Sequence, residues 1–205
     1  MLLIGLMGQA GAGKDSVADI IEAEVECVRF AFGDFLKAEV ADAFGVDVRL
    51  FHDRASKEQP RPELALHRCA STDFRYSAAG TELEAAATPR AVMQAWGDMR
   101  RGQDPSYFLH AAAVARAVAR NSGAEVMVAT DVRFRNEADW VSSHDGVLWR
   151  IDRRDLETVR EHHSEQQYRA IPYDLHIWNN GTLDELQRIV VDLVRVALEE
   201  HRRAA

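Results

Sequence analysis

The segment Gly8–Lys14, a glycine-rich loop that ends in a lysine, constrains the fold of this chain more than any other sequence feature. Gly8 and Gly13 flank four residues, and Lys14 follows directly. Glycines let the backbone turn tightly, so that successive amides point at an anion, and the lysine adds a point charge. An apolar run at 2–6 precedes the loop and a helical pattern follows it. This order of strand, glycine loop and helix is typical of a site for the phosphates of a nucleoside triphosphate.

The position after the lysine departs from the common pattern, in which a serine or threonine holds Mg²⁺. Here Asp15 follows the lysine and Ser16 comes next, so Ser16 is the predicted hydroxyl ligand of the metal. Asp15 has three open roles: it holds a metal-bound water, orients a substrate group, or caps the helix N-terminus. The residues of this segment predicted to bind ATP are Gly8, Ala10, Gly11, Ala12, Gly13, Lys14, Asp15 and Ser16.

Short apolar runs alternate with helical patterns along the chain, which predicts an α/β fold with a parallel sheet covered on both faces. The predicted strands are 2–6, 27–32, 125–130, 146–151 and 175–178. The predicted helices are 15–26, 35–44, one from 89, 136–142 and one that begins at the capping box Thr182–Glu185. Two segments interrupt this alternation, 52–88 with weak periodicity and 152–172 with dense charge. Both lack the apolar content of core elements, and they are either mobile flaps over a site or solvated excursions.

Charged residues follow the predicted strands at their carboxyl ends, where ligands bind in parallel sheets. Asp131 follows the strand 125–130 and either holds Mg²⁺ through water or caps a helix. Arg133, two residues later, is close enough in sequence to reach a phosphate. Asp34 and Lys37 follow the second strand and either form an acceptor site or, for Asp34, cap the next helix.

Arg90 and Gln94 lie four residues apart in the helix that begins at Pro89, so they share one face. An arginine suits a phosphate and a glutamine amide suits a base edge. The alternative is an ordinary amphipathic helix with Val92, Met93 and Trp96 in the core.

The charged segment 152–172 contains Arg153, Arg154 and Arg160, which predicts an arginine lid that neutralises charge during phosphoryl transfer. The alternative is a solvated loop. His162 and His163 in the same segment have no partner at a metal-binding spacing, and we expect both to face solvent.

Composition narrows the class of protein. The chain has 205 residues, which suits one domain, and a net charge of -8 with no evident basic face, which argues against a nucleic-acid partner. Cys27 and Cys69 lack metal-site spacing and are expected to be reduced. No apolar run is long enough for a signal peptide or a membrane span, so we expect a soluble, cytoplasmic protein.

Several local strings, in this order, resemble those of the phage-type deoxynucleoside monophosphate kinases. They are Gly13–Asp19, Phe32–Lys37, Pro89-Arg90 with Gln94–Gly97, Asp131–Ala138, His163–Glu165 and Asn180–Leu183. The most specific are Gly-Lys-Asp-Ser and Asp-Val-Arg-Phe-x-Asn-Glu. In that family an aspartate after the loop lysine is usual, so the resemblance also accounts for Asp15.

The resemblance implies one P-loop kinase domain over 1–205, with a central parallel sheet of about five strands flanked by helices. Its core would be 1–47, 89–151 and 173–205, its monophosphate-binding insertion about 48–88 and its arginine-rich lid about 152–172. It implies Mg²⁺-ATP as donor and a deoxynucleoside 5′-monophosphate as acceptor, and it leaves a homodimer open. If the protein is phage-encoded, its compartment would be the host cytoplasm.

The resemblance also implies roles for single residues. Arg90 and Arg133 would hold the acceptor phosphate, with Gln94 and Trp96 near its base. Arg153 and Arg154 would close from the lid, and Asn179 or Asn180 would lie near the donor adenine. Two alternatives stay open: a P-loop kinase of another small acceptor, such as dephospho-coenzyme A, and a nucleotide-dependent switch that transfers nothing.

Overall fold

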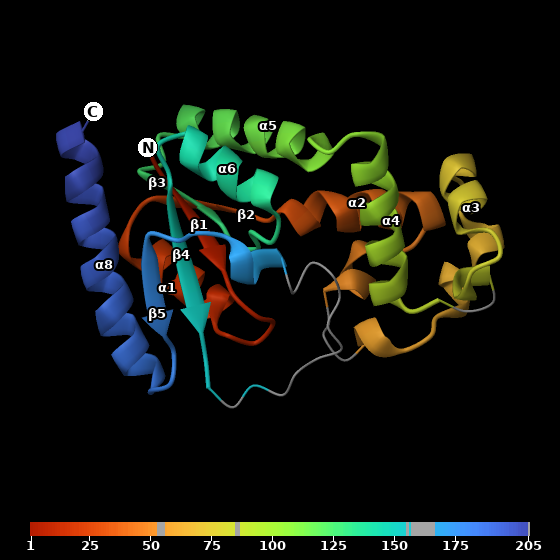
Figure 1. The fold of residues 1–205 in the computed structure, drawn as a ribbon, viewed down its shortest axis with the longest axis horizontal. Coiled ribbons are helices and arrows are strands. Elements are labelled where there is room, and N and C mark those ends of the chain that lie inside the picture. Colours follow the sequence, from red (N-terminus) through yellow and green to blue (C-terminus); the bar gives the residue numbers. More distant parts are fainter. Residues whose placement is uncertain (53–55, 85–86, 155, 157–166, 205) are drawn as a thin grey trace. The chain divides into compact units, whose positions relative to one another are not determined.

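A computed structural model describes residues 1–52, 56–84, 87–154, 156 and 167–204. The chain forms two compact units, coloured along the sequence in Figure 1. Unit 1 comprises Met1–Phe32 and Leu109–Ala205, and unit 2 comprises Gly33–Phe108. The predicted insertion at 48–88 lies within unit 2, and the predicted lid lies within unit 1. Arg160, His162, His163 and the string His163–Glu165 lie outside the described residues.

A five-stranded parallel sheet forms the centre of unit 1, which confirms the predicted α/β fold. Its strand order is β2-β3-β1-β4-β5. The strands are β1 (Leu2–Met7), β2 (Cys27–Phe30), β3 (Val126–Ala129), β4 (Val147–Asp152) and β5 (Leu175–Trp178). Because β1 is the middle strand, the loop that follows it emerges between the carboxyl ends of β3 and β4, where open parallel sheets bind ligands.

The helices lie close to the predicted segments, with two exceptions. The bounds are α1 (Lys14–Glu24), α2 (Phe32–Phe44), α3 (Thr72–Ala78), α4 (Pro89–Gln103), α5 (Tyr107–Asn121), α6 (Arg135–Ser143) and α8 (Leu183–Ala204). The sequence patterns predicted neither α3 nor α5. None of the described helices has the length and apolar content needed to cross a membrane.

Successive side chains of each strand point to opposite faces of the sheet, so the core of unit 1 has a part on each face. Leu2, Ile4 and Leu6 of β1 join one buried cluster with residues of α1 and α8. On the other face, a Cβ at Gly5 would come within 3.2 Å of Val141 of α6, so the absence of a side chain there lets α6 pack closely. Both faces are therefore covered, as parallel sheets require.

The predicted capping box at the start of α8 is confirmed. The Thr182 amide donates to Glu185 Oε2 at 2.8 Å, and the Glu185 amide donates to Thr182 Oγ1 at 3.2 Å. The bond from the Thr182 backbone amide is the main cause that lowers the pKa of Glu185. The two bonds satisfy amides that the first turn of a helix leaves without partners.

Unit 2 has a hydrophobic core of its own, which corrects the expectation that 52–88 lacks core residues. Seven residues of this segment are buried in one cluster with α2 and α4: Leu64, Leu66, Cys69, Phe74, Ala78, Leu83 and Ala87. Short 3₁₀ turns connect them, for example Pro62–Leu64 and Leu66–Arg68. Such turns carry no amphipathic period, and this explains why the segment appeared to be an excursion.

Candidate nucleotide site

The glycine loop at the carboxyl end of β1 has left-handed backbone at three positions, with φ of 147° at Gly8, 88° at Gly11 and 104° at Gly13. Side chains are also excluded by close neighbours. A Cβ at residue 8 would lie 2.1 Å from the Ile151 carbonyl oxygen of β4. A Cβ at residue 13 would lie 2.2 Å from Asn179 Nδ2. The loop therefore requires glycine both for its conformation and for its close contact with the sheet.

Lys14 is the first residue of α1, and its side chain folds back over the loop. Its Nζ donates to the carbonyl oxygens of Gly8 at 2.7 Å and Gln9 at 3.0 Å. The ammonium charge is thus fixed at the entrance to the loop, beside the positive end of the α1 dipole. Both features favour an anion at this place.

Asn179, which directly follows β5, holds the glycine loop in place by a hydrogen bond, although the two are far apart in sequence. Its Nδ2 donates to the Ala12 carbonyl oxygen at 2.9 Å, and its own amide donates to the Asp152 carbonyl at 2.8 Å. The side chain is buried, with 9% of Asn179 exposed, and Ala12 is fully buried. The resemblance implied that Asn179 or Asn180 would lie near the donor adenine, and this role of Asn179 was missed because no local pattern links residues so far apart.

Replacing Asn179 with alanine leaves the buried Ala12 carbonyl without this donor. We expect a loss of about 1–3 kcal/mol of unfolding free energy, together with weaker ATP binding. For a chain of this size, the melting temperature should fall by roughly 2–12 °C in a thermal unfolding scan. Asn180→Ala is the matched control and should change the melting temperature much less. Equal melting temperatures for Asn179→Ala and the wild type would contradict this role.

Asp15 and Ser16 lie in the first turn of α1. The residue before the helix is Gly13, without a side-chain cap, so Asp15 is not the N-cap; it is an exposed acidic residue in the first turn, where a carboxylate is favourable. Ser16 is partly buried one residue further on. The structure therefore supports Asp15 as a favourable charge at the helix N-terminus, although not as the N-cap residue, and it leaves the other two predicted roles open.

Asp131 lies beyond the carboxyl end of β3, as predicted, and it contacts the start of another helix. Its Oδ1 accepts a hydrogen bond of 2.7 Å from the amide of Phe32, the first residue of α2. The Phe32 ring packs edge-on against Phe30 and Trp140 in the same unit. The alternative reading as a helix cap is thus supported, although the helix concerned is α2 and not the one that follows Asp131 in sequence.

Arg133 is positioned through its backbone by Glu137, a carboxylate that is 2% exposed. Glu137 Oε2 accepts from the amides of Arg133 at 2.8 Å and Phe134 at 3.1 Å, just before α6 begins. A buried carboxylate needs such partners to offset its loss of hydration. The string Asp-Val-Arg-Phe-x-Asn-Glu therefore has a structural basis: its last residue fixes the backbone of its arginine.

Arg154 and Asn180 meet at the carboxyl ends of β4 and β5. The Arg154 amide donates to Asn180 Oδ1 at 2.7 Å, and the Arg154 guanidinium lies 5.8 Å from the centre of the Trp178 ring. Trp178 is 54% exposed, and Arg153 is also exposed. Both predicted arginines thus begin the segment after β4 on the same edge of the sheet as the glycine loop.

A polar network on β4 and β5 supports this edge. Asp152 Oδ2 accepts from Arg150 Nε at 2.8 Å and lies 2.9 Å from His176 Nε2. Arg150 also lies over the rings of Tyr168 and Tyr173, at 5.7 and 5.5 Å. The side chains of Arg150 and Asp152 are largely buried, so the network fixes the strand end from which Arg153 and Arg154 start.

In unit 2, Arg90 occupies the first turn of α4, behind the Thr88 N-cap and Pro89. Its Nε pairs with the carboxylate of Glu58, an ion pair that the sequence reasoning did not foresee. Asp34 and Lys37 of α2 pair with each other at 2.7 Å. Because α2 begins at Phe32, Asp34 lies inside the first turn and is not the N-cap.

Trp96 is a core residue, which corrects its prediction as a substrate contact. It is 2% exposed, its ring lies 4.8 Å from that of Phe74, and its Nε1 donates to Glu39 Oε2 at 2.8 Å. Glu39 also accepts from Arg100 and from the Tyr107 hydroxyl. Burial, and next the bond to Glu39, raise the pKa of Tyr107. Neither the ring face nor the indole N–H of Trp96 is available to a ligand.

The five-stranded parallel sheet, the glycine loop after its middle strand and a lysine at the start of the next helix together define the fold of the P-loop kinases. Comparison with known proteins is consistent with this class. The chain is 29% identical over 206 residues to the "Putative deoxynucleotide monophosphate kinase" of Acanthamoeba polyphaga mimivirus, covering 95% of this chain and 96% of that one. The predicted resemblance to this kinase type is thereby confirmed. No family model matches the chain.

Proposed function

We propose that the protein transfers the γ-phosphoryl group of ATP to a deoxynucleoside 5′-monophosphate, giving ADP and the deoxynucleoside diphosphate. The observation that carries the proposal is the glycine loop with Lys14 folded over it, clamped by Asn179 at the carboxyl edge of a parallel sheet. The likeness to the viral relative, across nearly the whole of both chains, supports a monophosphate as acceptor.

In this proposal the loop amides and Lys14 bind the β and γ phosphates of ATP. Arg133, Arg153 and Arg154, with partly buried or exposed side chains at the same edge, neutralise the charge that develops on the transferred group. Asn180, beside Arg154, lies near the donor base. The residues position reactants and stabilise charge, so no covalent enzyme intermediate is required.

Side chains with oxygen ligands, near the carboxyl ends of the strands, are suited to hold the Mg²⁺ ion that accompanies ATP. Among the described residues, no three His, Cys, Asp or Glu side chains gather into a metal site. A magnesium ion bound with a triphosphate needs only one or two protein oxygens besides phosphate and water. The Ser16 hydroxyl and the Asp131 carboxylate are oxygen ligands of the right chemistry. Held by these two residues, Mg²⁺ would offset the negative charge of the triphosphate.

In unit 2, the residues proposed to hold the acceptor lie on α4 and α2. Arg90 would bind its phosphate, Gln94 would face its base, and the pair Asp34 and Lys37 would lie along the same ligand. Trp96 has no direct contact in this assignment and instead holds α4 in the core.

A panel of acceptors tests the proposal. Purified protein is mixed with ATP, Mg²⁺ and each deoxynucleoside monophosphate in turn, and acceptor-dependent ADP release is measured. Stimulation by at least one monophosphate is expected, and none by dephospho-coenzyme A. Activity with dephospho-coenzyme A alone would indicate a different kinase, and ATP binding without acceptor-dependent release would indicate a switch.

The pairing of Arg90 with Glu58 leads to a separate prediction. The Glu58 carboxylate competes with the acceptor phosphate for the guanidinium and repels it. Glu58→Gln should therefore lower the KM for the acceptor about two- to fivefold with kcat unchanged, the size expected for one exposed ion pair. Glu63→Gln, an exposed carboxylate of the same segment, is the matched control. An equal KM in the two variants would contradict the competition.

A further inference from the structure

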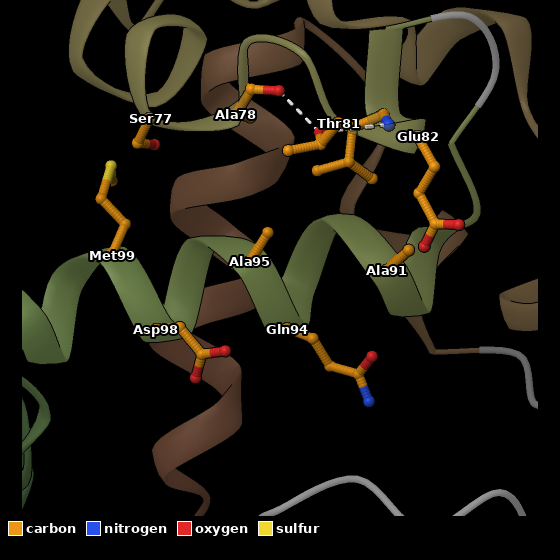
Figure 2. Close-up of a pocket in the computed structure, with 10 residues that line it drawn as sticks. Ser77, Ala78, Thr81, Glu82, Ala91, Gln94, Ala95, Asp98 and Met99 are labelled. Atoms are coloured by element: carbon orange, nitrogen blue, oxygen red, sulfur yellow. Dashed lines mark hydrogen bonds between the residues drawn. The ribbon is translucent and has the colours of Figure 1, made fainter.

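Unit 2 contains a pocket beside α4, and both Gln94 and residues further along this helix line it. Its volume is about 390 Å³, and it lies between α4 on one side and the end of α3 with the turn that follows it on the other (Figure 2). Ala91, Ala95 and Met99 of α4 face Ser77, Ala78 and Thr81 across it. Small side chains at 91 and 95 leave space along the helix surface for a flat ring.

The polar groups of the pocket are amides, hydroxyls and carboxylates. Gln94 and Asp98 project from the same side of α4, and the Glu82 carboxylate extends toward the Ala91 end of the pocket (Figure 2). The described lining residues include two carboxylates and no lysine, arginine or histidine. A phosphate dianion would be repelled here, whereas a neutral group that carries N–H donors would be attracted.

Arg90, Gln94 and Asp98 follow one another at spacings of four residues, so they form one stripe along α4. The stripe runs over about 12 Å, at 1.5 Å per residue. A cation stands at its N-terminal end, an amide in the middle and a carboxylate at the far end. This order of charges matches a nucleotide laid along the helix, with its phosphate at Arg90 and its base toward Asp98.

We propose that Asp98, with Gln94, selects guanine as the acceptor base; the inference rests on the proposed function. A carboxylate accepts two parallel N–H bonds, and guanine is the base that offers two neighbouring donors, N1–H and the N2 amino group. The Gln94 amide can donate to guanine O6 at the same edge. Thymine offers a single N–H between two carbonyl oxygens, which the carboxylates of Asp98 and Glu82 disfavour.

The test compares kcat/KM for dGMP, dAMP, dCMP and dTMP at saturating ATP. dGMP is expected to be the best acceptor and dTMP the poorest, with a ratio of roughly 5- to 100-fold, as for one bidentate contact to a base. Asp98→Asn, which places an N–H₂ donor against the guanine donors, should bring this ratio close to one. Asp42→Asn, an exposed aspartate outside the pocket, is the control and should leave the ratio unchanged.

Each outcome bears on one proposal. If no monophosphate stimulates ADP release, the proposed function fails. If some monophosphate is phosphorylated but dTMP or dAMP equals dGMP, or if Asp98→Asn keeps the wild-type ratio, the assignment of Asp98 is overturned while the function stands. Equilibrium binding of dGMP without ATP gives a second readout, and it should weaken in Asp98→Asn but not in Asp42→Asn.

Discussion

Replacing Lys14 with methionine is expected to lower phosphoryl transfer roughly 10²- to 10³-fold, the usual effect of removing one charged group that stabilises a transition state. Methionine keeps most of the apolar stem and removes the ammonium, which donates to the Gly8 and Gln9 carbonyls and is expected to hold the phosphates of ATP. The measurement is acceptor-dependent ADP release at saturating ATP, with the acceptor that the panel identifies.

The control is Lys57→Met, which removes one of the other two lysines at a position outside the proposed site. It should retain activity within about twofold, as surface substitutions commonly do. Thermal unfolding of Lys14→Met shows whether activity is lost because the protein unfolds or because the ammonium is missing. A variant that stays folded but no longer turns over ATP supports the role of Lys14 in binding the phosphates. Wild-type turnover in Lys14→Met would mean that the glycine loop is not the donor site.

Replacing Gly8 with alanine is expected to cost about 2–4 kcal/mol of unfolding free energy and to abolish tight ATP binding. The φ of 147° is unfavourable for any residue with a side chain, and the added Cβ would meet the Ile151 carbonyl oxygen at 2.1 Å. Relief requires the loop to move away from β4, which would displace the amides that are proposed to face the phosphates. Thermal unfolding and equilibrium ATP binding report the two effects separately.

The matched control for this substitution is Gly102→Ala. Residue 102 lies inside α4, and a Cβ there meets no atom within 4 Å. Alanine should therefore stabilise the helix by up to about 1 kcal/mol. A Gly8→Ala protein that unfolds at or above the temperature of Gly102→Ala would show that contact between the loop and β4 does not constrain residue 8.

Sequence patterns were sufficient for the sheet because each strand is a short apolar run beside a turn signal. The strand at Leu175–Trp178 agrees with the prediction, and the others differ at their ends by one or two residues. The helix α5 went unpredicted because Ala111–Ala113 and the alanines after them give no contrast between a buried and an exposed face. Exposed valines at 114 and 118 add to this ambiguity.

The core of unit 2 escaped prediction for a different reason. Phe51, Leu64 and Phe74 are buried together but lie ten or more residues apart in sequence, with short 3₁₀ turns between them. Only tertiary structure brings them together, so no local period indicates them. The buried position of Trp96 follows from the same core.

Within the site, the glycine loop and the aspartate after β3 were predictable, because their positions relative to strands are fixed by the fold class. The partners of these residues were not. Asn179 on Ala12, Asp131 on Phe32 and Glu58 on Arg90 are pairings across 167, 99 and 32 residues of sequence. Single-chain patterns describe spacing within an element and carry no information about such distant contacts.

The bond between Asn179 and Ala12 also sets an order for biosynthesis. The glycine loop is synthesised before the side chain that holds it, which is added 167 residues later. Synthesis proceeds from the N-terminus, so the nascent loop lacks this hydrogen bond until residue 179 has been added. The proposed nucleotide site is therefore complete only after β5 pairs with β4, and we expect nucleotide binding to follow that pairing.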